Sequence, residues 1–169
     1  MSVLFDYFVA PSDAEAAATL DRMGGPGASQ GGAKGAKRRL FRRSEGVQDS
    51  AYPVVADTGI DPVVQVGTLE ALLTERPYEE VISHPRQSEV IDDRDGGERL
   101  VVAITDTLVA ALAEASEEQL IEVAIPWSET EEFWGGGDPA ELAQLLKDLA
   151  VLARVARAEQ QFLYCWVCV

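Results

Sequence analysis

A long amphipathic helix near the C-terminus is the feature that most constrains the fold of this chain. Asp138 is a typical N-cap residue, Pro139 suits the first helical position, and Glu141 follows at the third. The apolar stripe behind them repeats at helical spacing and consists of Leu142, Leu145, Leu146, Leu149, Leu152, Ala153 and Ala156. A helix over residues 139–158 would be about 30 Å long. Its stripe needs a second apolar layer, which the rest of the chain must supply.

Strand-like segments at both ends of the chain can supply that layer. Residues 3–9 are rich in aromatic and branched side chains, and residues 162–169 place their aromatic side chains on one face. Residues 100–104 form a continuous apolar run, which predicts a strand buried on both faces. We therefore expect an α+β fold with a single small mixed sheet that contains both terminal strands and has amphipathic helices packed on it. The length of 169 residues suits one domain spanning residues 1–169.

Capping patterns predict the shorter helices. Ser12 is placed to cap a helix that runs to about Arg22, and Thr105 to cap the helix that follows the strand at 100–104. The pattern from Ser116 to Gln119 is a capping box for a short helix over 117–124. Pro62 opens a helix that runs to about Thr74. Residues 52–56 are expected to be extended, and residues 75–98 irregular apart from a short helix over 78–83.

Residues 24–46 predict a flexible, Gly-rich basic loop. They show no apolar period, and ordering glycine at this density is entropically unfavourable. The loop does not match a P-loop, because no Ser or Thr follows Lys34. Six of the 14 basic residues lie in it, namely Lys34, Lys37, Arg38, Arg39, Arg42 and Arg43. One hypothesis is therefore that this loop tethers an otherwise acidic domain to nucleic acid or to another acidic surface.

The acidic residues are distributed just as unevenly. The chain carries 29 acidic residues and a net charge of −15, which disfavours general binding to nucleic acid or to anionic membranes. From Leu100 to Leu146 there are ten acidic residues and no Lys or Arg. Such a segment serves either as a solubilising surface or as a docking face for a basic protein partner.

Aromatic residues within that acidic segment mark the predicted docking face. Aromatic side chains beside charged ones are typical of interface anchors. The predicted protein-binding residues are Trp127, Glu129, Glu131, Glu132, Phe133 and Trp134, in a loop before the long helix. The alternative is that both tryptophans turn inward and cover the core.

The patterns that would indicate catalysis are weak. Asp57-Thr58-Gly59 is similar to the active-site loop of aspartic proteases, but a turn before Pro62 explains the same residues. A small-molecule-binding protein or a hydrolase that uses carboxylates such as Asp57 and Asp61 remains the enzyme alternative. His84 is interpreted as a surface residue, and the chain contains no Gly-x-Ser-x-Gly motif. We assign no catalytic residue, no metal site and no cofactor.

The two cysteines, Cys165 and Cys168, are three residues apart within the predicted C-terminal strand. Residues at that spacing point to opposite faces of a sheet, so neither a disulfide between them nor a shared zinc site is expected.

The chain also resembles the YfbM-like bacterial domains of unknown function, and more closely an uncharacterised actinobacterial family. The YfbM-like resemblance rests on the strand and helix at the N-terminus and on the order of elements in the C-terminal third, namely an apolar run into a helix over 101–115, a short helix, the segment from Trp127 to Trp134, the long helix and a terminal strand. The closer resemblance rests on residues 60–73 and on the ending Tyr164-Cys165-Trp166. It implies a compact α+β fold and no particular activity.

Together these patterns predict a non-catalytic cytoplasmic binding or regulatory protein. Its acidic, tryptophan-containing face would dock a basic protein partner, as an immunity protein does when it neutralises a basic toxin. No signal peptide or membrane span is apparent. The identity of the partner and the oligomeric state stay open at this point.

Overall fold

A computed structural model describes residues 3–28 and 52–169. In this part of the chain, five strands form one sheet in the order β2-β1-β5-β4-β3, and every neighbouring pair is antiparallel. The strands are β1 (Leu4–Ala10), β2 (Val54–Val55), β3 (Val90–Arg94), β4 (Arg99–Ala103) and β5 (Phe162–Cys168). The α+β class is confirmed, and the sheet is antiparallel where a mixed one was predicted.

The two terminal strands lie side by side at the centre of the sheet. β1 pairs with β5 over its whole length, from Leu4 opposite Cys168 to Ala10 opposite Phe162. β4 pairs with the other edge of β5. The central position follows from composition, because these strands carry the apolar side chains that a sheet covered on both faces requires.

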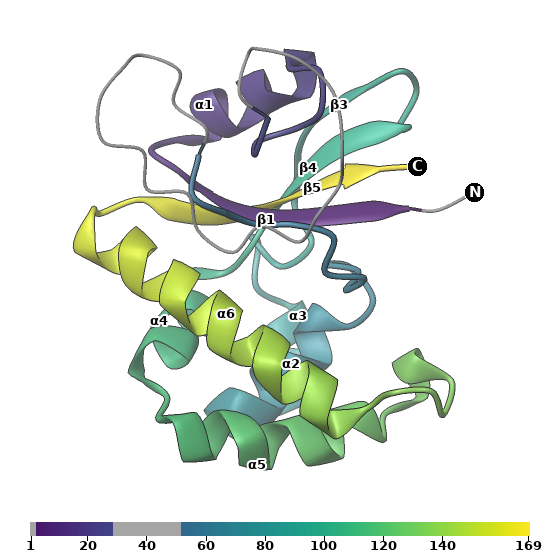
Figure 1. Cartoon of the computed structure of the whole chain (residues 1–169), viewed down its shortest axis with the longest axis vertical. Helices are drawn as coiled ribbons and strands as arrows, with labels where there is room; N and C mark the ends of the chain where they lie inside the picture. Colours follow the sequence, from purple (N-terminus) through teal and green to yellow (C-terminus); the bar gives the residue numbers. More distant parts are fainter. Residues whose placement is uncertain (1–2, 29–51) are drawn as a thin grey trace.

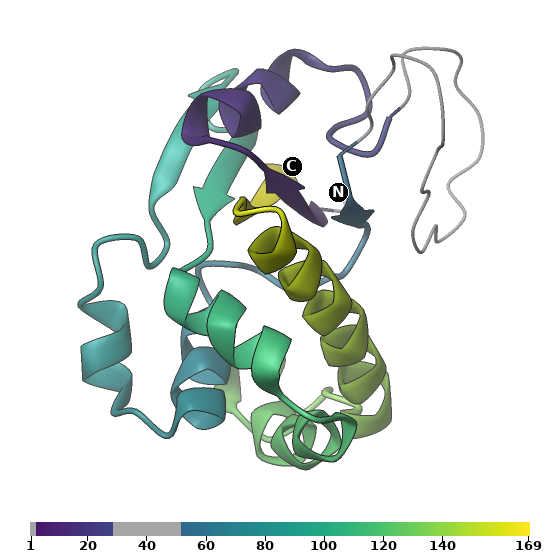
Figure 2. The same ribbon diagram turned by 90° about the vertical axis from the view of Figure 1, so that its left-hand side faces the viewer.

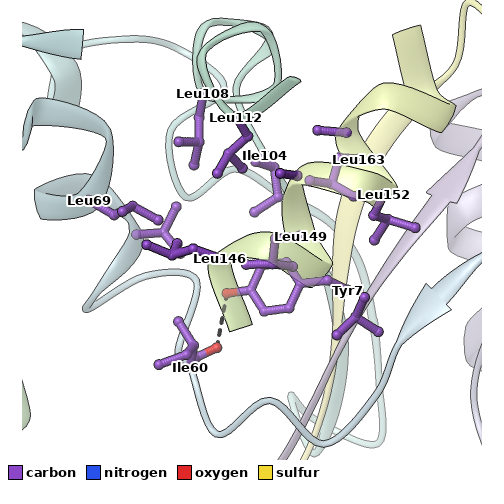
Figure 3. Packing of buried hydrophobic residues seen from close by; sticks show 14 of the residues in the cluster. Tyr7, Ile60, Leu69, Ile104, Leu108, Leu112, Leu146, Leu149, Leu152 and Leu163 are labelled. Carbon is purple, nitrogen blue, oxygen red and sulfur yellow. Dashed lines mark hydrogen bonds between the residues drawn. The ribbon is translucent and has the colours of Figure 1, made fainter. Parts of the chain in front are cut away.

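Helices form a thick layer on one face of the sheet (Figures 1 and 2). They are α2 (Val66–Thr74), α3 (Tyr78–Ile82), α4 (Asp106–Glu114), α5 (Glu117–Ser128) and α6 (Pro139–Ala158). α6 begins and ends as predicted, and the Asp138 side chain accepts hydrogen bonds from the backbone N–H groups of Ala140 and Glu141. It contacts both α4 and α5. The main core lies between this layer and the sheet. Figure 3 shows Tyr7 within it, donating a hydrogen bond from its hydroxyl to the Ile60 carbonyl.

A shorter helical segment covers the opposite face of the sheet. It consists of α1 (Asp13–Ala18) and the single turn η1 (Thr19–Asp21), and the Ser12 side chain caps α1 as predicted. Leu20 and Ala16 pack there against Phe8, Tyr164 and Trp166. The aromatic residues of β5 thus share one face, as their alternation predicts.

Three local predictions are corrected by the structure. Residues 75–98, predicted to be irregular, contain the strand β3, which pairs with β4. α2 begins at Val66, because residues 62–65 form a turn that Asp61 holds by accepting hydrogen bonds from Val63 and Val64. α5 continues to Ser128, four residues past its predicted end, and includes Pro126 in its last turn. The missing N–H of Pro126 leaves the Glu122 carbonyl without a helical partner, and this face of the helix is exposed to water.

The Gly-rich basic loop predicted over 24–46 lies mostly outside the described residues, including all six of its basic side chains. Among the helices that are described, none is both long and apolar enough to span a membrane.

Candidate protein-docking surface

Residues 129–138, here called the tryptophan loop, connect α5 to α6 and contain the single turn η2 (Glu131–Phe133). The two ends of the loop touch: a Cβ atom at Gly137 would lie 2.6 Å from the Ser128 carbonyl oxygen, so only glycine fits there. Hydrogen bonds across the loop hold its interior, including Trp134 N–H to the Glu131 carbonyl at 3.0 Å. The loop is therefore closed at its base and ordered within.

Trp134 is the most exposed aromatic side chain in the described residues. It is 94% exposed, and its backbone is left-handed with a φ of 53°. That conformation disfavours residues with a Cβ atom, by about 1–2 kcal/mol. Neither packing nor backbone preference thus explains a tryptophan at this position.

Trp127 is buried, unlike Trp134, and the prediction that it lies on the docking face is wrong. It belongs to α5 and is completely buried, with its indole N–H donating to the Gln65 carbonyl at 3.1 Å. Phe133 packs edge-on against it, with ring centroids 5.2 Å apart. Phe133 is half-buried and fixes the tryptophan loop to the core. The inward alternative therefore holds for Trp127 and in part for Phe133, but not for Trp134.

The three acidic residues of the loop have two different roles. Glu129 and Glu131 are exposed, and neither forms an ion pair with another described residue. Glu132 is half-buried and accepts a hydrogen bond from the Thr68 hydroxyl at 2.7 Å. Partial burial alone would raise the pKa of Glu132, but hydrogen bonds from Thr68 and Thr130 outweigh it and hold the pKa below its ordinary value. Glu132 therefore helps to position the loop.

The exposed face of α5 extends this surface. Ile121 and Ile125 are 44% and 50% exposed. Glu118 and Glu122 lie on the same side of the helix, four residues apart, and both are exposed, as is Glu129 directly after the helix. An exposed strip of apolar and acidic side chains therefore leads along α5 into the tryptophan loop. The two isoleucines were not predicted as part of the surface, although their spacing along α5 sets them apart from its buried residues.

A shallow hollow of about 390 Å³ lies on the other side of the loop. Ala71 and Leu72 of α2 line it, together with Thr68, Arg76, Tyr78 and Glu132. Glu132 therefore belongs both to this hollow and to the tryptophan loop.

The carboxylates of the enzyme alternative do not converge on one site. Asp61 is engaged in the turn before α2. Asp57 is exposed, with a φ of 52°, and its N–H donates to the Asp6 carboxylate at 2.8 Å. Partial burial raises the pKa of Asp6, although the hydrogen bond from the Asp57 N–H opposes this and the charge of Asp57 adds a smaller increase. Asp57 instead lines a separate groove of about 550 Å³ between the segment 55–58 and the first half of α6.

The remaining candidates have structural roles. Cys165 lies in the main core and Cys168 packs on the opposite face of the sheet, as predicted. Burial raises the pKa of the Cys165 thiol well above its ordinary value, which keeps it protonated and unreactive. His84 accepts a hydrogen bond from Arg86 N–H on its Nδ1 atom. Across residues 3–28 and 52–169, no group of three or more His, Cys, Asp or Glu side chains is arranged to hold a metal ion.

The basic residues that the structure describes already contact other groups of the same chain. Bidentate or single contacts join Arg86 to Asp13, Arg94 to Asp21, Arg99 to Asp95, Lys147 to Glu117 and Arg157 to Glu114. Arg154 donates to two backbone carbonyls at the end of α4, and the Arg22 guanidinium lies 5.4 Å from the Tyr52 ring centroid. Acidic residues without a basic partner among the described residues therefore remain, including those on the tryptophan loop and on the exposed face of α5.

Comparisons with protein-family models, curated proteins and solved structures find no match to this chain. The resemblance to the YfbM-like domains thus remains an expectation from the sequence.

Proposed function

We propose that this protein binds a basic protein partner through the tryptophan loop and the exposed face of α5. The observation that carries the proposal is Trp134, a side chain 94% exposed on a loop that is itself ordered. Tryptophan is the residue type most enriched among interface hot spots, where it fills a pocket on the partner. Its position here is unfavourable for folding, which is expected of a residue kept for binding.

The closed loop makes Trp134 an efficient anchor. Binding normally restricts loops and side chains, at about 0.5–1.5 kcal/mol for each side chain that is immobilised. Here the contact between Gly137 and Ser128 and the packing of Phe133 on Trp127 have already fixed the loop. Most of the free energy gained from burying Trp134 is then available for affinity.

The charge of the surface indicates a basic partner. Glu129 and Glu131 flank the anchor, and Glu118 and Glu122 continue the negative charge along α5. Complementary charges accelerate association and discriminate against acidic competitors. The apolar contact from Trp134, Ile121 and Ile125 would then determine how long the complex lasts.

The form of function that we propose is non-catalytic and cytoplasmic. Neutralisation of a basic toxin by an immunity-type protein requires such a surface, namely acidic, ordered in advance and anchored by an aromatic residue. The same properties suit other regulatory proteins that cover a basic surface on their target.

A charge-reversal experiment tests this function. The double variant Glu129→Lys/Glu131→Lys is compared with Asp93→Lys/Glu98→Lys, which makes the same charge change on the β3–β4 hairpin. Glu132 is left unchanged because of its bond to Thr68. The basic protein recovered from the native host is purified, and its association rate is measured at low and at physiological salt. We expect at least tenfold slower association for the loop variant alone, with a difference that shrinks as salt screens the charges. Equal rates for the two variants would refute the proposed surface.

A further inference from the structure

The groove between residues 55–58 and the first half of α6 is the second distinctive surface feature, here called the front groove. One wall is the end of β2 and the segment after it, with Val55, Ala56, Asp57 and Thr58. The other wall is the outer side of α6, with Ala140, Glu141, Leu142, Gln144, Leu145 and Asp148. In Figure 1 this part of α6 faces the viewer, and it begins just after the tryptophan loop. Its volume of about 550 Å³ is within the range of binding sites.

The charged residues of the front groove that the structure describes have a single sign. Asp57 lies on one wall and Glu141 and Asp148 on the other, and none of the lining residues within 3–28 and 52–169 is basic. Asp6 adds a fourth carboxylate behind Asp57, to which it is joined through the Asp57 N–H. Burial is the main reason that the pKa of Asp6 is raised, and the charge of Asp57 makes only a smaller contribution in the same direction. A cation in the groove would be attracted by the carboxylates on both of its walls.

The dipole of α6 indicates where the cation would lie. The positive end of a helix dipole acts over its first turn, so it partly offsets the charge of Glu141. Asp148 lies in the third turn, beyond that influence, and its side chain accepts only a neutral hydrogen bond from Gln144, at 3.2 Å. The most negative part of the groove is therefore between Asp57 and Asp148.

The apolar part of the lining indicates the shape of the ligand. Val55, Leu142 and Leu145 also line the groove, the first two largely buried and Leu145 half-buried, and they offer an apolar surface for aliphatic chains. Lysine and arginine combine an aliphatic stem with a charged end, and they bury the stem while the charge stays near its partner. A groove open along its length admits such side chains from an extended segment.

We propose that the front groove binds an extended segment of the basic partner and places a lysine or arginine side chain between Asp57 and Asp148. This inference rests on the proposed function, since it assigns a second contact to the same partner. The two contacts are within reach of one protein, because Ala140 comes six positions after Trp134 in the chain and six residue steps span at most about 22 Å.

A peptide titration tests the groove without the partner. The probe is an octapeptide of alternating arginine and alanine, and the same peptide with glutamate in place of arginine is its control. Backbone amide shifts of the full chain are followed by NMR, and affinity is measured by fluorescence anisotropy. We expect shifts grouped at residues 55–58 and 140–148 for the arginine peptide alone. Shifts spread over all acidic surfaces would overturn the inference.

Two matched variants separate the groove from general attraction of charges. Asp57→Asn with Asp148→Asn removes two charges from the groove, and asparagine tolerates the left-handed backbone at position 57. Asp93→Asn with Glu98→Gln removes two charges from the β3–β4 hairpin. The groove variant should bind the peptide at least tenfold more weakly, and the hairpin variant within twofold of wild type. Equal weakening would contradict a specific site.

A competing occupant and the partner itself are tested in the same system. A second variant has the six basic residues at 34–43 changed to glutamine. If this variant binds the peptide and the wild type does not, the groove accommodates the basic segment of the same chain, and the inference is wrong. If the purified partner binds the groove variant as tightly as wild type, the inference is also wrong. The proposed function would still stand in that case, because it depends on the charge reversal in the tryptophan loop.

Discussion

Replacement of Trp134 by glycine should leave the protein as stable as the wild type or slightly more stable. The side chain makes almost no contact within the chain, since it is 94% exposed. Its backbone lies in the left-handed region, with a φ of 53°, where glycine is favoured. A residue selected for stability would not be tryptophan, so a change close to zero or positive separates a binding role from a structural one.

The magnitude follows from three contributions. Relief of the left-handed backbone stabilises the variant by about 1–2 kcal/mol. The small buried part of the side chain, roughly 15 Å² of about 250 Å², costs about 0.4 kcal/mol when removed. The greater freedom of glycine in the unfolded chain costs about 0.4–1 kcal/mol. The free energy of unfolding should therefore change by between about −0.4 and +1.2 kcal/mol.

The assay is urea unfolding followed by circular dichroism, with Trp127→Ala as the comparison. Trp127 is fully buried and hydrogen-bonded to Gln65, so its truncation should lower the free energy of unfolding by about 3–5 kcal/mol. If Trp134→Gly lowered it by more than about 1.5 kcal/mol, Trp134 would be packed in solution, and the argument for an exposed anchor would be wrong.

Three further changes test the fold around the surface. Gly137→Ala should destabilise the protein by about 1–3 kcal/mol in urea unfolding, because its Cβ would collide with the Ser128 carbonyl, and wild-type stability would show that the loop is not closed there. Glu70 is 1% exposed, and burial raises the pKa of its carboxyl group. The folded state therefore binds the proton more tightly than the unfolded state does. The stability that this proton binding contributes is lost as pH rises through the raised pKa. Glu70→Gln should therefore gain stability over wild type between pH 4 and pH 8, by about 1.4 kcal/mol for each unit by which the pKa is raised, and a constant difference would contradict the burial of a charge. Cys165→Ser should destabilise the protein by about 1–3 kcal/mol, and Cys168→Ser should change its stability little, because only the first variant buries a hydroxyl group. Equal effects would contradict the placement of the two cysteines on opposite faces.

Local signals predicted those elements whose ends are set by the chain itself. The Asp138 cap and Pro139 located the start of α6, and the reciprocal bonds of Ser116 and Gln119 located the start of α5. Such signals work because a cap satisfies backbone groups within a few residues, whatever the rest of the fold does. The membership of both terminal strands in one sheet followed equally from their apolar composition, whereas their direct pairing is known from the structure.

The missed strand β3 shows where charge misled the prediction. Its sequence includes Asp92 and Asp93, which have low strand propensity. At the edge of the sheet these charges face solvent, and Arg94 pairs with Asp92 and Asp21. The turn signal Asp95-Gly96 was present, and it lies in a four-residue loop between the paired Arg94 and Arg99, with positive φ angles at residues 95–97.

The candidate surface was predicted in part. A charge count found the acidic segment, but it did not separate the two tryptophans. Trp127 follows Leu120, Val123 and Ala124 at spacings of seven, four and three residues, which places it on the buried stripe of α5. Pro126 obscured that period. The front groove was beyond prediction, because it joins residues about 90 positions apart that only the packing of α6 beside β2 brings together.

Site-specific photo-crosslinking in the native host tests the central claim most directly. A benzophenone amino acid is introduced at position 134 in one chain and, as a control, at position 98 on the distant hairpin in another. The account predicts one crosslinked protein from position 134 alone, attached through a segment of that protein rich in lysine and arginine. No product from position 134, the same products from both positions, or attachment to an acidic surface would contradict the claim that the tryptophan loop docks a basic partner.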